Sequence, residues 1–406
     1  MKCQRQTGGA RVYRQYHQPM TVAHSSMQST MPLPSPAAAE HSQRVVAHIA
    51  AEIARADGWI PFDRYMQLAL YAPELGYYVA GAHKFGDSAA GGDFVTAPEI
   101  SPLFAQALAR QFAQLFEQVP SRIVEFGAGS GALAGDLIAA LSKCGVALES
   151  YSIVEVSPDL MDRQRQRLQG APVEWLGTPP TEFHGVMLAN EVLDVMPVKL
   201  FVKRGNVTFE RGVVIGPDGG LTFDERRASD VLASEVAAIE VEHAALPDGY
   251  ASEVNLVAES WMRSSARWLR RGALLVIDYG FPQREYYHPQ RLMGTVMCHF
   301  RHHAHSDPLW MAGLNDVTAH VDFSAMAAAA HDAGLNVLGY TSQAHFLLNC
   351  GVLDQLQAQH TPQSSGALHR LVSEAEMGEL VKVLMVGRGV QGPLIGFTRG
   401  DRLHSL

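Results

Sequence analysis

The chain has 406 residues and a net charge of −9, and 47% of its residues are hydrophobic and 18% charged. This length and composition are typical of a globular protein with one main catalytic domain and additions to it. The negative charge argues against a general nucleic-acid binder, and no apolar run approaches the roughly 20 residues needed to span a bilayer.

Residues 1–39 are predicted to form a disordered tail, because the segment lacks Asp and Glu and ends in the Pro-rich run PLPSPAAA. An acid-free, Arg-bearing start is typical of a mitochondrial transit peptide. The lack of a clear amphipathic helix favours instead a disordered bacterial tail or an upstream mis-assigned start. The four scattered cysteines suggest no disulfide framework, so we expect a reducing compartment. The bacterial cytoplasm is preferred, with the mitochondrial matrix as the alternative.

Residues 40–120 are predicted to form an amino-terminal helical lid or substrate region. Val45, Ile49 and Ile53 fall on one stripe of a helix, and PFDRYMQLALYAP has the flanking prolines of a second, shorter helix. The Gly-rich loop GDSAAGGDFVTAPEIS then precedes an amphipathic helix, SPLFAQALARQFAQLFEQ. The loop crowds polar residues together, although such a composition is also that of a solvated connection.

The stretch 121–159 has the pattern of the first half of a nucleotide-binding βαβ unit. A short apolar strand is predicted at Ile123–Phe126, and residues 132–141 have helical spacing. Glycines lie at alternate positions between them: Gly127, Gly129 and Gly131. Glycine suits this turn because it adopts positive φ and lets a ligand approach the backbone. The next strand, predicted at 152–156, carries Glu155, where an acid can accept hydrogen bonds from both ribose hydroxyls of an adenosine cofactor.

Two cofactor classes fit this unit. GAGSGA satisfies the loose dinucleotide pattern if Ala132 fills its last place, and the same stretch satisfies the ExGxGxG pattern of S-adenosylmethionine (SAM) methyltransferases. Glu125 distinguishes the two, since a pyrophosphate cradle has little use for an acid whereas an amino-acid cofactor carries an ammonium group. We therefore predict SAM, with NAD as the alternative. A turn that binds no ligand is disfavoured by the placement of Glu155.

The remaining α/β units follow in order along the chain. PDLMDRQRQRLQG predicts a helix, VEWLG a third strand, residues 186–189 a fourth, and ALLVIDYG a fifth that ends at Asp278. A long loop is expected up to about Asp322, followed by a helix at FSAMAAAAHDAG and a sixth strand at LNVLGYT. A helical excursion is predicted over 343–388, with a final strand at 393–399.

Residues 199–250 are predicted to form a β-rich insertion between the fourth and fifth strands. Its first half alternates in polarity and carries Gly-Asn and Asp-Gly turns, which predicts an antiparallel meander. Residues 229–247 have helical spacing, and the next helix is expected at about 252–270. The cofactor-binding domain would then consist of 121–198 and 251–406.

Polar residues follow the fourth predicted strand, at Asn190, Glu191 and Asp194. In an open α/β sheet the carboxyl ends of the strands line the ligand crevice. We therefore expect these three residues to contact a substrate or cofactor. Asn190 is equally well placed to cap the following helix.

The run CHFRHHAH, residues 298–305, invites a metal interpretation. Its adjacent His302 and His303 match no usual spacing of helical or finger ligands, and no partner set of Cys and His lies elsewhere at a recognisable interval. We predict no metal here. The run is interpreted as a cationic or hydrogen-bonding loop over the crevice.

Several motifs together resemble the MidA-like proteins, and they occur in that family's order from about residue 40 to the end. The motifs are GYY (76–78), GDFVTAPEIS (92–101), VEFGAGSGAL (124–133), VEVSP (154–158), NEVLDVMPV (190–198), IDYG (277–280) and DVTAHVDFS (316–324). The resemblance is specific because ordinary methyltransferases lack GDFVTAPEIS and NEVLDVMPV. It implies a class I SAM-dependent methyltransferase with a seven-stranded sheet whose last strand is antiparallel. Mitochondrial members of the family are complex I assembly factors that form symmetric dimethylarginine on a subunit of NADH dehydrogenase.

The resemblance also implies roles for individual residues. Gly127, Gly129 and Gly131 would face the methionine part of SAM, with Glu125 near its ammonium group. Glu155 would hold the ribose, and Asn190 and Glu191 would lie beside the transferred methyl group. A lid would carry four further residues: Asp93, Thr96, Glu99 and Ser101.

One position departs from the pattern of many methyltransferases, which carry an acid after the third strand that contacts the adenine. Here WLGTPPTEF offers no Asp, and only Glu174 or Glu182 is nearby. The adenine contact is therefore left without an obvious partner.

An arginine acceptor, which only the resemblance implies, sets the demands on catalysis. Methyl transfer from a sulfonium mainly requires positioning and desolvation. A guanidinium must also be oriented and lose a proton, which a carboxylate bound in a bidentate way can achieve. Glu191 is the first catalytic candidate, followed by Asp194 and Glu99. A non-catalytic SAM-binding assembly factor and an NAD-linked oxidoreductase are the alternative functions.

Overall fold

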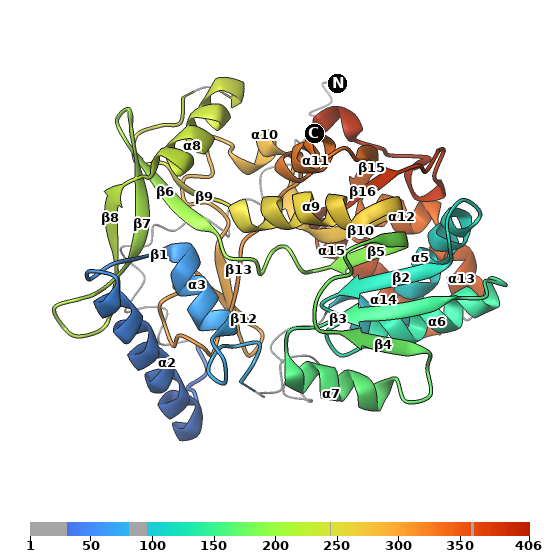
Figure 1. The fold of residues 1–406 in the computed structure, drawn as a ribbon, viewed down its shortest axis with the longest axis horizontal. Coiled ribbons are helices and arrows are strands. Elements are labelled where there is room, and N and C mark those ends of the chain that lie inside the picture. The colour runs from blue at the N-terminus through green and yellow to red at the C-terminus, as the bar shows by residue number, and fades with distance from the viewer. Residues whose placement is uncertain (1–30, 81–95, 244, 359–360) are drawn as a thin grey trace, which may run out of the picture.

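The computed structural model describes residues 31–80, 96–243, 245–358 and 361–406 and is built around an eight-stranded sheet (Figure 1). Seven of the strands form one continuous order, and the short strand β14 (Val321–Asp322) pairs in parallel with the end of β10. The strand order is β4-β3-β2-β5-β10-β16-β15. Neighbouring strands are parallel except at β16, which is antiparallel to both β10 and β15. The strands are β2 (Arg122–Phe126), β3 (Ser150–Val154), β4 (Val173–Leu176), β5 (Phe183–Asn190), β10 (Leu269–Phe281), β15 (Asn336–Ser342) and β16 (Val381–Arg388). This order confirms the predicted α/β fold with its reversed last strand.

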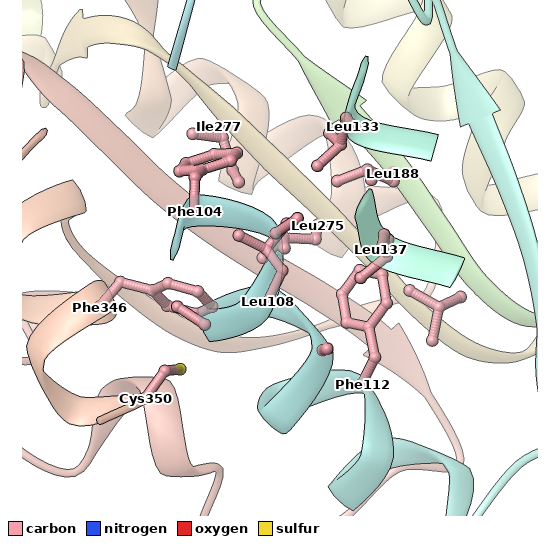
Figure 2. Close-up of a cluster of buried hydrophobic side chains, with 14 of the residues drawn as sticks. Phe104, Leu108, Phe112, Leu133, Leu137, Leu188, Leu275, Ile277, Phe346 and Cys350 are labelled. Atoms are coloured by element: carbon pink, nitrogen blue, oxygen red, sulfur yellow. The ribbon is translucent and has the colours of Figure 1, made fainter. Parts of the chain in front are cut away.

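Helices cover both faces of this sheet, so its central strands are apolar on both sides. Along β10, Leu275 and Ile277 join one hydrophobic cluster, while Leu274 and Val276 join the other. Figure 2 shows the first cluster, where Phe104 and Phe112 of α5 (Pro102–Phe116) lie among apolar side chains of α6 (Ala132–Lys143), β5 and β10. The covering helices are α5 (Pro102–Phe116), α6 (Ala132–Lys143), α12 (Gln343–Asn349) and α13 (Val352–Ala358) on that face, and α9 (Leu256–Trp268) and α11 (Phe323–Asp332) on the other.

A second, antiparallel sheet contains the predicted meander. Its path is β1-β7-β6-β9, with β8 paired to β7. The strands are β1 (Ile60–Pro61), β6 (Lys199–Arg204), β7 (Val207–Ile215), β8 (Leu221–Arg227) and β9 (Ala251–Val254). Helices α2 (Pro36–Arg55) and α3 (Phe62–Tyr71) lie beside β7, at the end of the molecule opposite the main sheet (Figure 1), and α8 (Asp230–His243) follows the meander. The sheet therefore continues past the expected insertion boundary at residue 250.

The segment expected as a long loop after the fifth strand is instead interrupted by a short helix and several short strands. It contains α10 (Gln283–Tyr286), β14 (Val321–Asp322) and a small antiparallel sheet of β11 (Met297–Phe300), β12 (His303–His305) and β13 (Asp316–Thr318). The fifth strand itself continues beyond Asp278 to Phe281. These short strands carry charged and histidine residues, so they have no alternation strong enough to be recognised from the sequence.

The carboxyl-terminal assignment was wrong in two places. Residues 381–388, placed in a helical excursion, form β16 between β10 and the edge strand β15, whereas α14 (Pro362–Val372) and α15 (Met377–Leu380) precede it. The expected final strand at 393–399 is a 3-10 helix over Ile395–Phe397. Because β16 is buried on both faces, it lacks the two-residue alternation that identifies exposed strands.

Two helix starts also differ from the prediction because of capping side chains. Helix α2 begins at Pro36, inside the expected tail, where the Ser35 hydroxyl accepts a hydrogen bond from the Ala38 amide at 3.2 Å. Residues 251–254 are a strand, and α9 begins only after Asn255, which caps it by accepting from the Ala258 amide at 2.9 Å. No helix in the described part of the chain is long and apolar enough to cross a membrane.

Candidate active site

The glycine turn connects β2 to α6 and has the backbone geometry that the sequence predicts. Gly127, Gly129 and Gly131 all have positive φ, at 61°, 54° and 80°. Residues with side chains rarely adopt these angles, so the alternate glycines are required by the turn. Gly131 also approaches Leu168 closely, because a Cβ there would lie 3.3 Å from the leucine Cδ1. The turn therefore presents mainly backbone to the cavity that it lines.

Glu155 follows the end of β3 directly and is buried. Its carboxylate accepts hydrogen bonds from the Ser157 amide and from Nε2 of Gln164, both at 2.9 Å. The same Gln164 amide donates to the Gly129 carbonyl at 2.9 Å, so it connects the glycine turn to the acid of the next strand. Sequence analysis missed Gln164, because nothing distinguishes one buried glutamine among the polar residues of α7 (Pro158–Arg167).

Glu125 lies on β2 with 2% of its surface exposed, and it lines the same cavity. Its Oε2 accepts a hydrogen bond from the Tyr151 hydroxyl at 2.7 Å. Burial, and to a smaller extent the neighbouring Glu155, raise the pKa of Glu125 to about 7, against the effect of the Tyr151 hydrogen bond. A cation beside Glu125 would favour its ionised form, so the residue fits the ammonium group of an amino-acid cofactor.

The turn after β5 carries the predicted catalytic residues and wraps around Asp278. Glu191 has a positive φ of 52°, an uncommon conformation for a residue with a side chain. Oδ2 of Asp278 accepts hydrogen bonds from the backbone amides of Val192, Leu193 and Asp194, at 3.2, 2.9 and 3.3 Å. Asp278 therefore holds the turn in place. Sequence analysis recognised it only as a strand end, although an acid within an apolar strand was a usable signal.

Burial raises the pKa of the three carboxyl groups at this turn. Burial and then the nearby Asp278 raise the pKa of Glu191 to about 8. The pKa values of Asp194 and Asp278 are also raised, first by burial, although backbone amides oppose the change at Asp278. Oδ1 of Asp194 is buried without a hydrogen-bond partner, as is Oδ1 of Asn190. A cationic hydrogen-bond donor that reached Asp194 would satisfy its unpaired oxygen and favour the ionised carboxylate.

Two tyrosines of the amino-terminal region complete this side of the cavity. The rings of Tyr71 and Tyr78 stack with centroids 5.6 Å apart, and both line the cavity. The Tyr78 hydroxyl donates to Oδ1 of Asp316 at 2.7 Å, and the Tyr71 hydroxyl donates to the Val195 carbonyl at 3.0 Å. The predicted lid region is therefore part of the site wall.

Glu99, the third catalytic candidate, lies on α4 (Ala97–Ile100) and contacts the glycine turn. It accepts a hydrogen bond from the Ser130 hydroxyl, and Arg167 Nη1 lies 3.2 Å from its Oε1 and 2.7 Å from the Ser130 oxygen. A carboxylate paired in this way is better suited to anchor α4 than to act as a base. The Ala97 amide lies 3.4 Å from Oε1 of Glu191, so α4 contacts both ends of the site.

The other predicted lid residues have different positions. Thr96 lines the cavity, whereas the Ser101 side chain caps α5 by accepting a hydrogen bond from the Leu103 amide at 3.2 Å. Asp93 lies outside the described residues. Of the predicted lid positions, Thr96 and Glu99 are therefore the ones that the structure brings to the cavity.

The His-rich run forms the hairpin of β11 and β12. Its turn residues Arg301 and His302 both have positive φ, as a two-residue type I′ turn requires. His299 lines the cavity, and His305 shares a hydrogen bond with Oδ1 of Asn315 at 3.0 Å. Among the residues that the structure describes, no group of three or more His, Cys, Asp or Glu side chains is arranged to hold a metal ion. One histidine of the run thus reaches the cavity wall.

The two acids considered for the adenine contact are directed elsewhere. Glu174 accepts a hydrogen bond from the Ser152 hydroxyl at 2.7 Å, and Glu182 pairs with Arg270 at 2.7 Å on the surface. The cavity beside β3 and β4 is instead lined by Val156, Leu160, Gly177 and Pro179. Apolar side chains and backbone, rather than an acid, form this part of the wall.

One cavity of about 1850 Å³ is lined both by the glycine turn and by the turn after β5. The glycine turn, Glu125 and Glu155 line one part of it, and Glu191 and Asp194 line another. Sites for one small molecule typically have volumes of about 300–1000 Å³. The cavity therefore has room for a cofactor and for part of an acceptor beside it.

Comparisons with known proteins agree with this arrangement. Residues 107–341 match the model of a family of S-adenosyl-L-methionine-dependent methyltransferases. A crystal structure of a Burkholderia thailandensis protein bound to S-adenosyl-homocysteine is 48% identical, covers 93% of this chain and 100% of that one, and superposes with a TM-score of 0.88. Mitochondrial protein arginine methyltransferases named NDUFAF7 are more distant. The Danio rerio protein is 28% identical over 83% of both chains, and the Homo sapiens protein 29% identical over 73% of this chain and 71% of that one.

Proposed function

The chain belongs to the S-adenosyl-L-methionine-dependent methyltransferase family, and we propose that it methylates an arginine side chain of a protein partner. The cofactor predicted from Glu125 and the glycine turn is confirmed, and the NAD-linked alternative is set aside. The glycine turn, Glu125, Glu155 and Asn190 would hold this cofactor, which supplies a methyl group activated on a sulfonium.

The observation that supports a cationic acceptor is the buried carboxyl cluster beside the glycine turn. Oδ1 of Asp194 is buried without a partner, and the Glu191 side chain lines the same cavity. A guanidinium presents several N–H donors in one plane and can bind such carboxylates in a bidentate way. Its charge would also favour the ionised carboxylates that burial disfavours. The relatives named arginine methyltransferases support the same acceptor.

Glu191 has the properties expected of the group that receives the acceptor's proton. A guanidino nitrogen that gains a methyl group must lose one proton if the product is to keep a single positive charge. A carboxylate whose pKa is raised towards 8 is a stronger base than an exposed one, and its pKa lies near the working pH. Asp194 would orient the guanidinium, and Asp278 would hold the turn that presents Glu191 and Asp194 together.

The partner that the family resemblance favours is a subunit of NADH dehydrogenase, so we propose a role in complex I assembly. Two features of the site support a macromolecular acceptor. The cavity is larger than a single small ligand needs, and the amino-terminal residues Tyr71 and Tyr78 form part of its wall.

The test begins with titration calorimetry of the purified protein with S-adenosyl-L-methionine, using NADH as the control. We expect saturable binding of the first ligand only. Labelled-methyl transfer into cell lysate, followed by mass spectrometry, should then place the label on an arginine. Cofactor binding without transfer to any protein would support a non-catalytic assembly factor instead. Label on another residue type would contradict the arginine assignment while leaving the methyltransferase intact.

A further inference from the structure

Several of the apolar side chains that line the cavity are also exposed on the protein surface. Val257, Leu292, Met293 and Leu380 are 42%, 48%, 38% and 37% exposed, and all four line the cavity. Single apolar residues are ordinary on a protein surface, but several in the lining of one cavity indicate a binding surface. These four side chains are apolar, whereas the carboxyl cluster is acidic. They are therefore suited to an apolar part of the ligand whose cationic part would bind the carboxyl groups.

Three of these residues lie on a wall next to the turn that carries Glu191. The Ala251 amide, at the start of β9, donates to the Leu292 carbonyl at 2.9 Å. Strand β9 leads to Asn255, whose Nδ2 donates to two backbone carbonyls of the turn after β5, at 3.3 and 3.4 Å. Val257 follows two residues later on α9. Together, Val257, Leu292 and Met293 form a surface that we call the apolar wall.

The apolar wall is held in position by a buried carboxyl group. Glu253, on β9, is 1% exposed, and its Oε1 accepts hydrogen bonds from the Thr295 amide, the Thr295 hydroxyl and the Tyr286 hydroxyl, at 2.8, 2.6 and 2.7 Å. Gly294 packs so closely that a Cβ would lie 2.1 Å from Oε2 of Glu253. A surface fixed in this way loses little conformational entropy when it binds a ligand.

Charge and volume together limit what can occupy this space. The adjoining carboxyl groups of Glu191 and Asp194 suit one cationic group, while an anionic lipid surface would be repelled by the net charge of −9. The cavity exceeds the volume that a cofactor alone requires. An extended acceptor segment with one arginine and apolar neighbours matches both the carboxyl groups and the wall.

We propose that the apolar wall selects the acceptor, by binding apolar side chains that flank the methylated arginine in an extended protein segment. This inference rests on the proposed function and narrows its substrate class. Free arginine would engage only the carboxyl groups, and a segment with small polar neighbours would leave the wall exposed to water.

The test compares two peptides that share a central arginine and differ only in flanking leucine or serine residues. Methyl transfer is measured with saturating cofactor, for the unaltered protein and for the Leu292→Ser/Met293→Ser variant. We expect kcat/KM to be roughly tenfold higher for the leucine-flanked peptide, mainly through KM, because burying one or two such side chains has an effect of that size. In the variant this preference should disappear, while kcat for the serine-flanked peptide and the affinity for the cofactor stay unchanged.

The matched control is Val241→Ser, because Val241 is 86% exposed on α8 and is not part of the cavity wall. It should leave the preference for the leucine-flanked peptide intact. Equal kcat/KM for both peptides in the unaltered protein would overturn the proposal, as would an equal loss for both in the variant. If light scattering showed that the unaltered protein is a dimer and the variant a monomer, the apolar wall would be a contact between two copies of the chain. That result would also overturn the proposal. Failure to methylate any arginine peptide or protein would contradict the proposed function instead.

Discussion

The two ends of the cavity to which we assign the cofactor and the proposed acceptor are assembled in different ways, and they are called the cofactor end and the acceptor end. The cofactor end comes from one continuous βαβ unit, in which the glycine turn and Glu155 are separated by a single helix and connected by Gln164. The acceptor end combines residues far apart in the sequence: Tyr71, Tyr78, Ala97, Glu191, Asp194, Asp278 and Asp316. Cofactor chemistry therefore depends on a local motif, whereas acceptor chemistry depends on the complete tertiary fold.

Glu155 differs from the acids of the acceptor end in how its carboxylate is satisfied. Glu155 accepts two hydrogen bonds from the protein, so the cofactor end is arranged before its ligand arrives. At the acceptor end, Oδ1 of Asp194 has no partner and the pKa of Glu191 is raised to about 8. A cationic acceptor should therefore change the protonation of its own site much more than the cofactor's ribose would.

The largest expected effect is that of Glu191→Gln, which should impair methyl transfer at the acceptor end and leave the cofactor end intact. Glutamine keeps the size of the side chain but removes the base, so we expect kcat for methyl transfer to fall by about 10²–10⁴-fold. The dissociation constant for S-adenosyl-L-methionine, measured by calorimetry, should change less than about threefold. A collapse of cofactor affinity would show that Glu191 belongs to the cofactor end and that its assigned role is wrong.

The same contrast explains what the sequence could predict. The glycine turn and Glu155 were predicted because each follows from local backbone requirements and strand order. Asn190, Glu191 and Asp194 were predicted from the rule that strand ends line the crevice. Asp278 and Asp316 were not, because their roles depend on contacts with residues more than 80 positions away. The apolar strand β16 was missed for a related reason, since burial on both faces removes the alternation that would identify it.

At the cofactor end, Glu155→Ala should weaken binding without changing the chemistry. Loss of hydrogen bonds to a charged carboxylate typically weakens binding by about 10–100-fold. We expect that increase in the dissociation constant for S-adenosyl-L-methionine, with kcat nearly restored at saturating cofactor. Unchanged cofactor affinity, measured by calorimetry, would remove Glu155 from the site.

The raised pKa of Glu191 predicts a pH dependence at the acceptor end. If the ionised form is required, kcat/KM for the acceptor should rise about tenfold from pH 7 to pH 9 for a pKa of about 8, and less if bound cofactor lowers that value. A profile that is flat over this range would contradict the assignment of Glu191 as the base.

Stability should change with pH in the opposite direction. The folded-state pKa of Glu191 lies above its ordinary value of 4.5, so the folded protein holds a proton that the unfolded chain has lost. The free energy of unfolding should therefore fall as the pH rises from about 4.5 towards 8. Denaturant titrations at pH 5.5 and pH 8 should show a smaller difference for Glu191→Gln than for the unaltered protein.

The smallest expected effect concerns helix α4, which contacts both the cofactor end and the acceptor end of the cavity. Glu99 pairs with Arg167 and Ser130 of the cofactor end, while Ala97 of the same helix contacts Glu191. Glu99→Gln and Arg167→Ala should each raise the KM for the acceptor by about two- to fivefold, because partly exposed ion pairs contribute about 0.2–1 kcal/mol.

A double-mutant cycle distinguishes this anchoring role from a general effect of lost charge. If the pair acts as one unit, the double variant should be no worse than either single variant, and kcat should stay within about twofold of the unaltered value. Arg165→Ala is the control, since Arg165 is also an exposed arginine of α7 but pairs with Asp162 instead. If Arg165→Ala raised the KM for the acceptor as much as Arg167→Ala does, the change in KM would be an effect of surface charge. If Glu99→Gln alone slowed turnover by about two orders of magnitude or more, Glu99 would be restored as a catalytic residue.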